Sequence, residues 1–345
     1  MTGAASQQKR GKDGVAQRVV FDQMGGPEVL RIVEEADPVP GAGEVLVDLR
    51  SIGLNRADVA FRSGKYLIQP SLPCGLGVEG AGVVADIGPD VEGFAVGDRV
   101  CILPAFPQGG RYASYVTRGV FPAHSLMPVP DGLDDIGASA FGVAYLTAWG
   151  GMVEIGGLKA GDFVLISAAS SSVGLAAIRV AKLVGAVPVA VTRTSAKIPA
   201  LREAGADHAI ASAECDLGAA LRDIVGSAGL NLVFDPVAGP FVESLIPFMA
   251  EEGKMVIYGG LSDQPTMFDR RPMLARGLSM IGYTVGQILK HADRRARGLA
   301  FLEDGIAKGV VQPAIDRVFP FAEVAAAHRH MEANSHVGKI VLSVP

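Results

Sequence analysis

The stretch from Asp162 to Lys197 constrains the fold more than any other part of the chain. It consists of an apolar run at 163–166, a turn of small residues at 167–174, a helical pattern that ends at Gly185, and a second apolar run at 187–191. Parallel strands need a crossover connection of this length. The stretch therefore predicts a βαβ unit in a parallel sheet.

The turn inside this unit has the composition of a phosphate-binding loop. Small side chains let a pyrophosphate approach the backbone N–H groups at a helix N-terminus, where the helix dipole also favours negative charge. The usual glycine fingerprint is absent, since the spacing A-x-x-G-x-x-G is filled by Ala168, Ser171 and Gly174. An ordinary buried βα turn is the alternative. The residues that we predict to bind the cofactor here are Ser170, Ser171, Ser172, Val173 and Gly174.

The residues after the second strand indicate which dinucleotide binds. A site for NAD normally has Asp or Glu roughly 20 residues past the glycines, whereas a 2′-phosphate requires Arg or Lys. The run 192–197 contains no acid but has Arg193 and Lys197, with Ser195 as a hydroxyl donor. Charge-assisted contacts from these side chains predict NADPH as the cofactor. Solvated residues at a helix start are the alternative.

A second glycine-rich turn follows a later apolar strand. Gly259 and Gly260 come directly after the strand predicted at 255–258, at a carboxyl strand end where ligands of doubly wound sheets bind. Glycine at this place permits close approach of a nicotinamide ring. A simple turn is the alternative.

Two sequence patterns divide the chain into domains. Its 345 residues, 49% apolar and 19% charged, suffice for two cores. We expect a disordered arm at 1–16, short alternating strands of a β domain at 17–133 with a return at 288–345, and alternating helices and buried strands at 134–287. The fold class is therefore α/β, with a doubly wound six-strand parallel sheet.

Composition also limits the partners and the location. A net charge of −5 without a basic block argues against a nucleic-acid surface. No apolar run reaches the roughly 18 residues of a membrane span, and no signal peptide is recognisable, so we expect a cytoplasmic protein without membrane contact. Cys74, Cys101 and Cys215 are far apart and are expected to be reduced thiols.

Several motifs in a fixed order carry a family resemblance. They are Gly53-Leu54-Asn55-Arg56-Ala57-Asp58, Arg62-Ser63-Gly64-Lys65-Tyr66, the glutamate motif at 77–84, Gly97-Asp98-Arg99-Val100 and the closing Gly338-Lys339-Ile340-Val341-Leu342. Over roughly residues 18–345 the chain resembles the zinc-free quinone oxidoreductase (zeta-crystallin-like) branch of the medium-chain dehydrogenase/reductases. The resemblance implies a GroES-like, mainly-β catalytic domain beside the Rossmann domain.

The resemblance also bears on metal binding. Zinc members of the superfamily carry a ligand Cys where this chain has Asn55 and a ligand His where it has Val78. Neither residue replaces a thiolate or an imidazole at zinc, so no metal is expected. Glu79 is expected to be a buried, hydrogen-bonded carboxylate. Without a Lewis acid, hydride must go to an acceptor that is already electrophilic, such as a quinone or an α,β-unsaturated carbonyl.

Four further site residues follow from the resemblance. Tyr66 stands where enoyl-thioester reductases place a proton donor, and the alternative is a tyrosine that lines the pocket. Asn55 is predicted to orient the substrate carbonyl or the nicotinamide ribose, against a turn-stabilising amide. Thr147 corresponds to a position near the nicotinamide, against a plain helix threonine. Lys339, in the closing motif, is assigned to the cofactor site.

These observations predict an NADPH-dependent reductase of quinones or activated alkenes. A 2-enoyl-thioester reductase and a non-catalytic NADPH-binding protein remain as alternatives, because fold alone does not fix activity. The apolar strand predicted at 279–285 lies at the far edge of the sheet, where it forms a pairing template. We therefore expect a homodimer in which a symmetric partner covers this edge.

Overall fold

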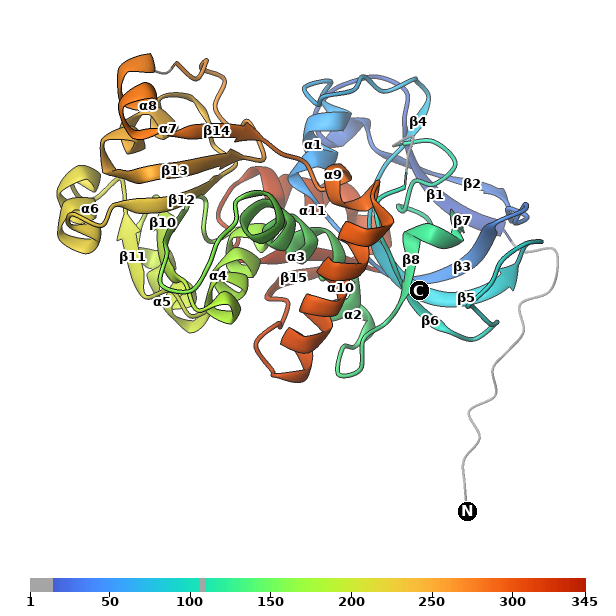
Figure 1. Ribbon diagram of the computed structural model, residues 1–345. Coiled ribbons are helices and arrows are strands. Elements are labelled where there is room, and N and C mark those ends of the chain that lie inside the picture. Colours follow the sequence, from blue (N-terminus) through green and yellow to red (C-terminus); the bar gives the residue numbers. More distant parts are fainter. Residues whose placement is uncertain (1–14, 106–108, 268) are drawn as a thin grey trace. The chain divides into compact units, whose positions relative to one another are not determined.

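The computed structural model describes residues 15–105, 109–267 and 269–345 (Figure 1). Most of the arm expected at 1–16 lies outside these residues, and Val15 and Ala16 already belong to the first strand. The chain forms two compact units. Unit 1 comprises the residues up to Val129 together with Val318–Glu332 and Val341–Pro345, and unit 2 comprises Pro130–Arg317 and Ala333–Ile340.

Unit 1 is mainly β, as expected from its short alternating strands. Its central strand β3 is rich in aliphatic residues and is bonded to β5 and β7, so most of its side chains are buried. Within the described residues the sheet orders are β2-β1-β4 and β15-β16-β3-β5-β6-β8, with β7 on β3. The elements are β1 (Val15–Phe21), β2 (Arg31–Ala36), β3 (Glu44–Gly53), α1 (Arg56–Arg62), β4 (Cys74–Gly75), β5 (Gly80–Ile87), β6 (Arg99–Ile102), β7 (Arg118–Pro122), β8 (Leu126–Pro128) and α11 (Val324–Glu332), together with the later residues of β15 (Ile315–Pro320) and β16 (Lys339–Ser343).

Unit 2 is a doubly wound α/β sheet, which confirms the predicted fold class. The described strands follow the order β11-β10-β9-β12-β13-β14, all parallel, which is the order 3-2-1-4-5-6 of a Rossmann fold (Figure 1). The elements are α2 (Asp135–Ser139), α3 (Gly142–Trp149), β9 (Phe163–Ile166), α4 (Ser172–Val184), β10 (Val187–Thr192), α5 (Ile198–Glu203), β11 (His208–Ala211), α6 (Leu217–Val225), β12 (Leu230–Asp235), α7 (Gly239–Leu245), β13 (Met249–Ile257), α8 (Arg270–Arg276), β14 (Ser279–Gly282), α9 (Gly286–Leu289) and α10 (Ala292–Ala307).

The predicted βαβ stretch is present as β9, α4 and β10. Residues such as Leu165 and Val189 are fully buried in the core between sheet and helices. The direction of the sheet order reverses between β9 and β12, and the turn after β9 opens at this switch point. Ligands of open α/β sheets bind at such points, so the fold places the predicted phosphate turn at the favoured edge.

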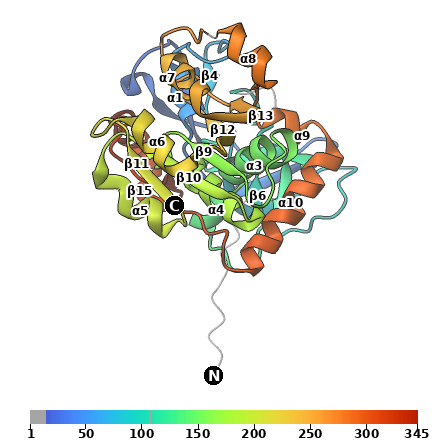
Figure 2. The same ribbon diagram turned by 60° about the vertical axis from the view of Figure 1, so that its left-hand side comes forward.

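One helical region differs from the expected boundaries. Residues 288–317 fall into unit 2 and not into the β domain, because α10 packs on α3 (Figure 2). A Cβ atom built at Gly298 would lie 2.8 Å from the Trp149 ring, so glycine permits this close contact between the two helices. Within the described residues, no helix combines the length and the apolar character needed to cross a bilayer.

Candidate active site and cofactor site

The turn after β9 shapes the N-terminus of α4. Ser171 is the N-cap residue, and its hydroxyl accepts a hydrogen bond from the Gly174 N–H at 3.1 Å. A Cβ atom built at Gly174 would lie 2.6 Å from the Ala169 backbone, so only glycine lets the helix approach the turn this closely. Ala168 adopts a positive φ of 45°, in a region where glycine is normally favoured. The serine-containing turn thus keeps the close helix–turn packing of a dinucleotide-binding loop.

The segment 333–340 joins the turn to the end of β10, a link that sequence reasoning missed. The Gly338 N–H donates to the Ser170 carbonyl at 2.9 Å. The Lys197 ammonium donates to the carbonyls of Asn334 and His336, both at 3.0 Å. Lys339 is almost fully buried directly after Gly338. The structure therefore brings together three predicted cofactor residues that lie far apart in the sequence.

The end of β10 carries an acid as well as the predicted basic residues. Arg193 is exposed, whereas burial, followed by the nearby Arg193 charge, lowers the pKa of Lys197. The Glu214 carboxylate accepts a hydrogen bond from the Ser195 N–H at 3.0 Å. Hydrogen bonds from Ser195 also lower the pKa of Glu214, which keeps its carboxylate ionised.

Sequence reasoning missed Glu214 because the residue comes from the loop after β11. No strand was predicted at 208–211, and the contact depends on the pairing of β11 with β10, which makes the two strands end at the same sheet edge. The Ser212 N–H extends this pairing by donating to the Thr192 carbonyl at 2.8 Å. An acid therefore lies beside the predicted 2′-phosphate site.

The two predicted glycines after β13 differ in their surroundings. A Cβ atom built at Gly259 would lie 2.9 Å from the Pro236 carbonyl oxygen, so this glycine is required for packing between two strand-end turns. At Gly260 an added Cβ atom would meet no atom within 4 Å. Thr147 is mostly buried within α3. Gly259 therefore has a structural role, while steric crowding does not account for Gly260.

In unit 1, Asn55 lies at the N-terminus of α1. Its backbone N–H donates to Asp58 Oδ2 at 2.8 Å, which is one half of a capping box. Its side-chain amide donates to Glu79 Oε1 at 2.9 Å. Glu79 is 1% exposed, as expected for a buried and hydrogen-bonded carboxylate. The other half of the box is the Asn55 side chain, which accepts from the Asp58 backbone N–H, so the helix cap and Glu79 together hold the Asn55 amide in one orientation.

Tyr66 lies half-buried a short distance beyond α1. Its ring packs edge-to-face on Phe61, with the ring centroids 6.4 Å apart. Burial, followed by the negative charge of Asp58, raises the pKa of Tyr66 above its ordinary value of 10.0. The phenol therefore stays protonated at neutral pH, which is the form that a proton donor requires. Asp58 thereby accepts a hydrogen bond from the backbone of Asn55 and raises the pKa of Tyr66, the two predicted catalytic residues.

Comparison with known proteins identifies the family. The description "Alcohol dehydrogenase GroES-like domain" matches residues 41–155, and "Zinc-binding dehydrogenase" matches residues 204–342. The human synaptic vesicle membrane protein VAT-1 homolog is 31% identical over 94% of this chain and 85% of its own length. The 2-haloacrylate reductase of a Burkholderia species is 28% identical, covering 94% of this chain and 97% of the reductase. Escherichia coli quinone oxidoreductase, solved in complex with NADPH, is 28% identical with a TM-score of 0.87, covering 95% and 99% of the two chains.

The chain belongs to the medium-chain dehydrogenase/reductase superfamily, in its zinc-free quinone oxidoreductase branch. It is an oxidoreductase of this superfamily that uses a nicotinamide cofactor. The residues present fit such a cofactor, because the N-terminus of α4 is lined by small residues and Gly174 allows the close helix approach that a pyrophosphate site needs.

The donor residues of this medium-chain reductase do not fit zinc. The two positions assigned to zinc ligands hold Asn55, whose amide donates to a carboxylate, and Val78, a hydrocarbon. The described part of the chain contains no group of three His, Cys, Asp or Glu side chains placed to hold a metal ion. A tetrahedral zinc site needs thiolate, imidazole or carboxylate ligands, which neither Asn55 nor Val78 supplies.

Proposed function

We propose that this chain is an NADPH-dependent reductase that transfers hydride to a quinone or an α,β-unsaturated carbonyl without a metal. The observation that carries the proposal is the Asn55 amide, held by Glu79 at the place where zinc relatives carry a ligand. An amide does not provide the Lewis acidity that alcohol oxidation requires. The acceptor must therefore be electrophilic before it binds.

The cofactor role divides among residues of unit 2. When bound, NADPH supplies the hydride. The turn before α4 holds the pyrophosphate through backbone N–H groups, and Arg193 binds the 2′-phosphate. The other residues that we propose to contact the pyrophosphate, the 2′-phosphate or the nicotinamide are Ser170, Ser171, Ser172, Val173, Gly174, Ser195, Lys197, Lys339, Thr147, Gly259 and Gly260.

The acceptor role belongs to unit 1. Asn55 orients the acceptor carbonyl or the nicotinamide ribose with its fixed amide. Tyr66 gives its phenolic proton to the enolate that forms when hydride adds to an activated alkene. The raised pKa of Tyr66 supports this role, because the phenol is protonated across the physiological range.

The relatives support a small, electrophilic acceptor. One similar protein reduces a 2-haloacrylate, which is an activated alkene, and another is a quinone oxidoreductase bound to NADPH. We further propose a homodimer, because β14 forms the edge of the described six-stranded sheet and a second copy would cover it. A cytoplasmic location is part of the proposal and agrees with three free cysteines.

The test measures NADPH oxidation against quinones, enones and a crotonyl thioester. The proposal expects turnover of quinones or enones by the parent, and a slower enone rate for Tyr66→Phe than for the control Tyr112→Phe. Tyr112 is a suitable control because its phenol donates to Glu44 elsewhere in unit 1. Turnover confined to the thioester would assign an enoyl-thioester reductase. Tight NADPH binding without turnover of any acceptor would overturn the proposal.

A further inference from the structure

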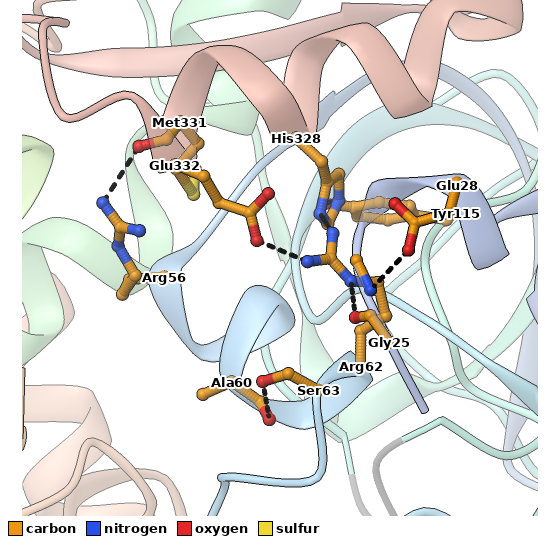
Figure 3. Close-up of polar contacts among 11 residues, drawn as sticks. Gly25, Glu28, Arg56, Ala60, Arg62, Ser63, Tyr115, His328, Met331 and Glu332 are labelled. Carbon is orange, nitrogen blue, oxygen red and sulfur yellow. Dashed lines mark hydrogen bonds and ion pairs between the residues drawn. The ribbon is translucent and has the colours of Figure 1, made fainter. Parts of the chain in front are cut away.

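A row of buried polar side chains connects α11 with α1 in unit 1 (Figure 3). Arg62 comes from α1, Tyr115 from the segment before β7, and His328 from α11. Arg62 is 1% exposed, and Tyr115, His328 and Asp58 are fully buried. Buried polar groups are costly unless they are bonded to one another. The proposed reaction uses none of these four side chains directly, so their arrangement needs its own explanation.

The hydrogen bonds of this row run in one direction. A guanidinium only donates, so Arg62 Nη1 donates to His328 Nδ1 at 2.8 Å and the ring proton resides on Nε2. Nε2 then donates to the Tyr115 hydroxyl at 3.3 Å, which leaves the phenolic proton for Asp58 Oδ2 at 3.2 Å. Burial, followed by the Arg62 charge, lowers the pKa of His328 to about 3, so the ring is neutral at physiological pH.

The two ends of the row are anchored differently. At the far end, Arg62 Nε donates to the Gly25 carbonyl at 3.0 Å, and Nη2 forms an ion pair with Glu332 (Figure 3). At the near end, the same Asp58 oxygen that accepts from Tyr115 also accepts from the Asn55 N–H. The orientation of Asp58 is therefore set from α11, and Asp58 in turn holds the backbone of Asn55.

We propose that Tyr115 and His328 are positioning residues that act through Asp58 on Asn55. The inference rests on the proposed function, in which Asn55 contacts the acceptor or the nicotinamide ribose. Loss of the Tyr115 hydroxyl removes one of the two hydrogen bonds that Asp58 Oδ2 accepts, and this loosens the N-terminus of α1. Because the lost bond ends on a charged group, Tyr115→Phe should lower kcat about 10-fold. The affinity for NADPH should change little, since its proposed pyrophosphate and 2′-phosphate contacts belong to other residues.

A double-mutant cycle distinguishes positioning from simple destabilisation. Tyr115→Phe is made in the parent and in Asn55→Ala, and kcat, KM, NADPH affinity and melting temperature are measured. The control is Tyr283→Phe, which removes another buried phenol that donates to the Leu146 carbonyl at 3.3 Å. The proposal expects Tyr115→Phe to slow the parent but not Asn55→Ala, and Tyr283→Phe to leave kcat unchanged.

Two outcomes of the cycle overturn the proposal. An equal loss of kcat in both backgrounds means that Tyr115 is only structural, while the reductase assignment stands. If Asn55→Ala keeps the parental kcat on the acceptor panel, the row cannot act through Asn55. Absence of all turnover in the parent is a different result, because it refutes the proposed function itself.

Two substitutions of His328, to glutamine and to leucine, test the same inference. They also provide a test if Tyr115→Phe fails to fold. The amide of glutamine accepts from Arg62 through oxygen and donates to Tyr115 through nitrogen, whereas leucine does neither. His328→Gln should therefore retain kcat within about 3-fold of the parent, and His328→Leu should lose about 10-fold. Equal rates for the two folded variants would contradict the inference.

Discussion

Cofactor preference offers the sharpest test of the proposed site, because opposite charges lie beside the predicted 2′-phosphate position. Arg193 is exposed at the end of β10, and Glu214 accepts a hydrogen bond from the Ser195 N–H at 3.0 Å. An incoming 2′-phosphate is attracted by the guanidinium and repelled by the carboxylate. Arg193→Ala and Glu214→Gln should therefore change the use of NADPH in opposite directions.

The expected change in the KM for NADPH depends on how far the substituted side chain is exposed to solvent. A hydrogen bond to a charged group contributes about 1.5–3 kcal/mol, or about 10- to 100-fold in affinity. Because solvent and salt screen Arg193, the lower end applies, and Arg193→Ala should raise the KM for NADPH about 10-fold. Glu214→Gln removes the charge but keeps an acceptor for the Ser195 N–H, so the KM for NADPH should fall about 2- to 5-fold.

The assay compares kcat/KM for NADPH and NADH at low and high salt. NADH lacks the 2′-phosphate, so its KM should change by less than about 2-fold in either variant. Higher salt should reduce the effect of Arg193→Ala, because exposed charges are screened. Arg202→Ala, on the neighbouring helix α5, is the matched control. If Arg193→Ala weakens both cofactors alike, or if the parent uses both equally, the 2′-phosphate site has been misplaced.

Four further predictions follow from the same structure. Tyr66→Phe should keep NADPH binding and should slow the turnover of enones, by about 10²–10⁴ at most, more than the turnover of quinones. In the parent, the raised pKa of Tyr66 should move the alkaline loss of enone turnover above pH 10.0. Equal enone rates in the variant and the parent would leave Tyr66 as a pocket-lining residue. Purified protein should contain no stoichiometric zinc and should keep its activity in chelator, which elemental analysis showing one zinc per chain would disprove. Light scattering should report a dimer at micromolar concentration, and a monomer would contradict pairing through β14. The folded pKa of His328, about 3, lies below the ordinary 6.5, so the unfolded chain binds more protons between these values and stability should decrease as the pH is lowered through that window. His328→Gln should flatten this dependence in acid unfolding.

The fold was predictable because local pattern and sheet geometry agree. The apolar runs at 163–166 and 187–191, separated by one helix, allow few arrangements other than parallel neighbours, and the structure pairs them as β9 and β10. The assignment of residues 288–317 depended on long-range packing instead. Gly298 permits the close contact of α10 with Trp149, and nothing in the local sequence indicates which partner this glycine faces.

The candidate site was predictable only where its residues are local. The turn and the helix start after β9 could be predicted because Ser171 and Gly174 are three residues apart and act on the same helix end. Glu214 could not be recognised in this way, because it reaches Ser195 across the sheet edge. The row from Arg62 to His328 spans 266 residues and likewise depends on tertiary packing. Spacing in the sequence carries no signal for such contacts.

The segment 333–340 decides which basic residue is the better probe of the cofactor site. Lys197 donates to the carbonyls of Asn334 and His336, and the same segment bonds to the phosphate turn through Gly338. Removing the ammonium would leave two carbonyls without their donor and would disturb the turn as well as the charge. A weaker affinity for NADPH in a Lys197 variant would therefore not show whether a phosphate contact was lost or the order of the segment 333–340 was disturbed. The Arg193 side chain forms no such hydrogen bond to the described residues, so its substitution tests the proposed 2′-phosphate contact alone.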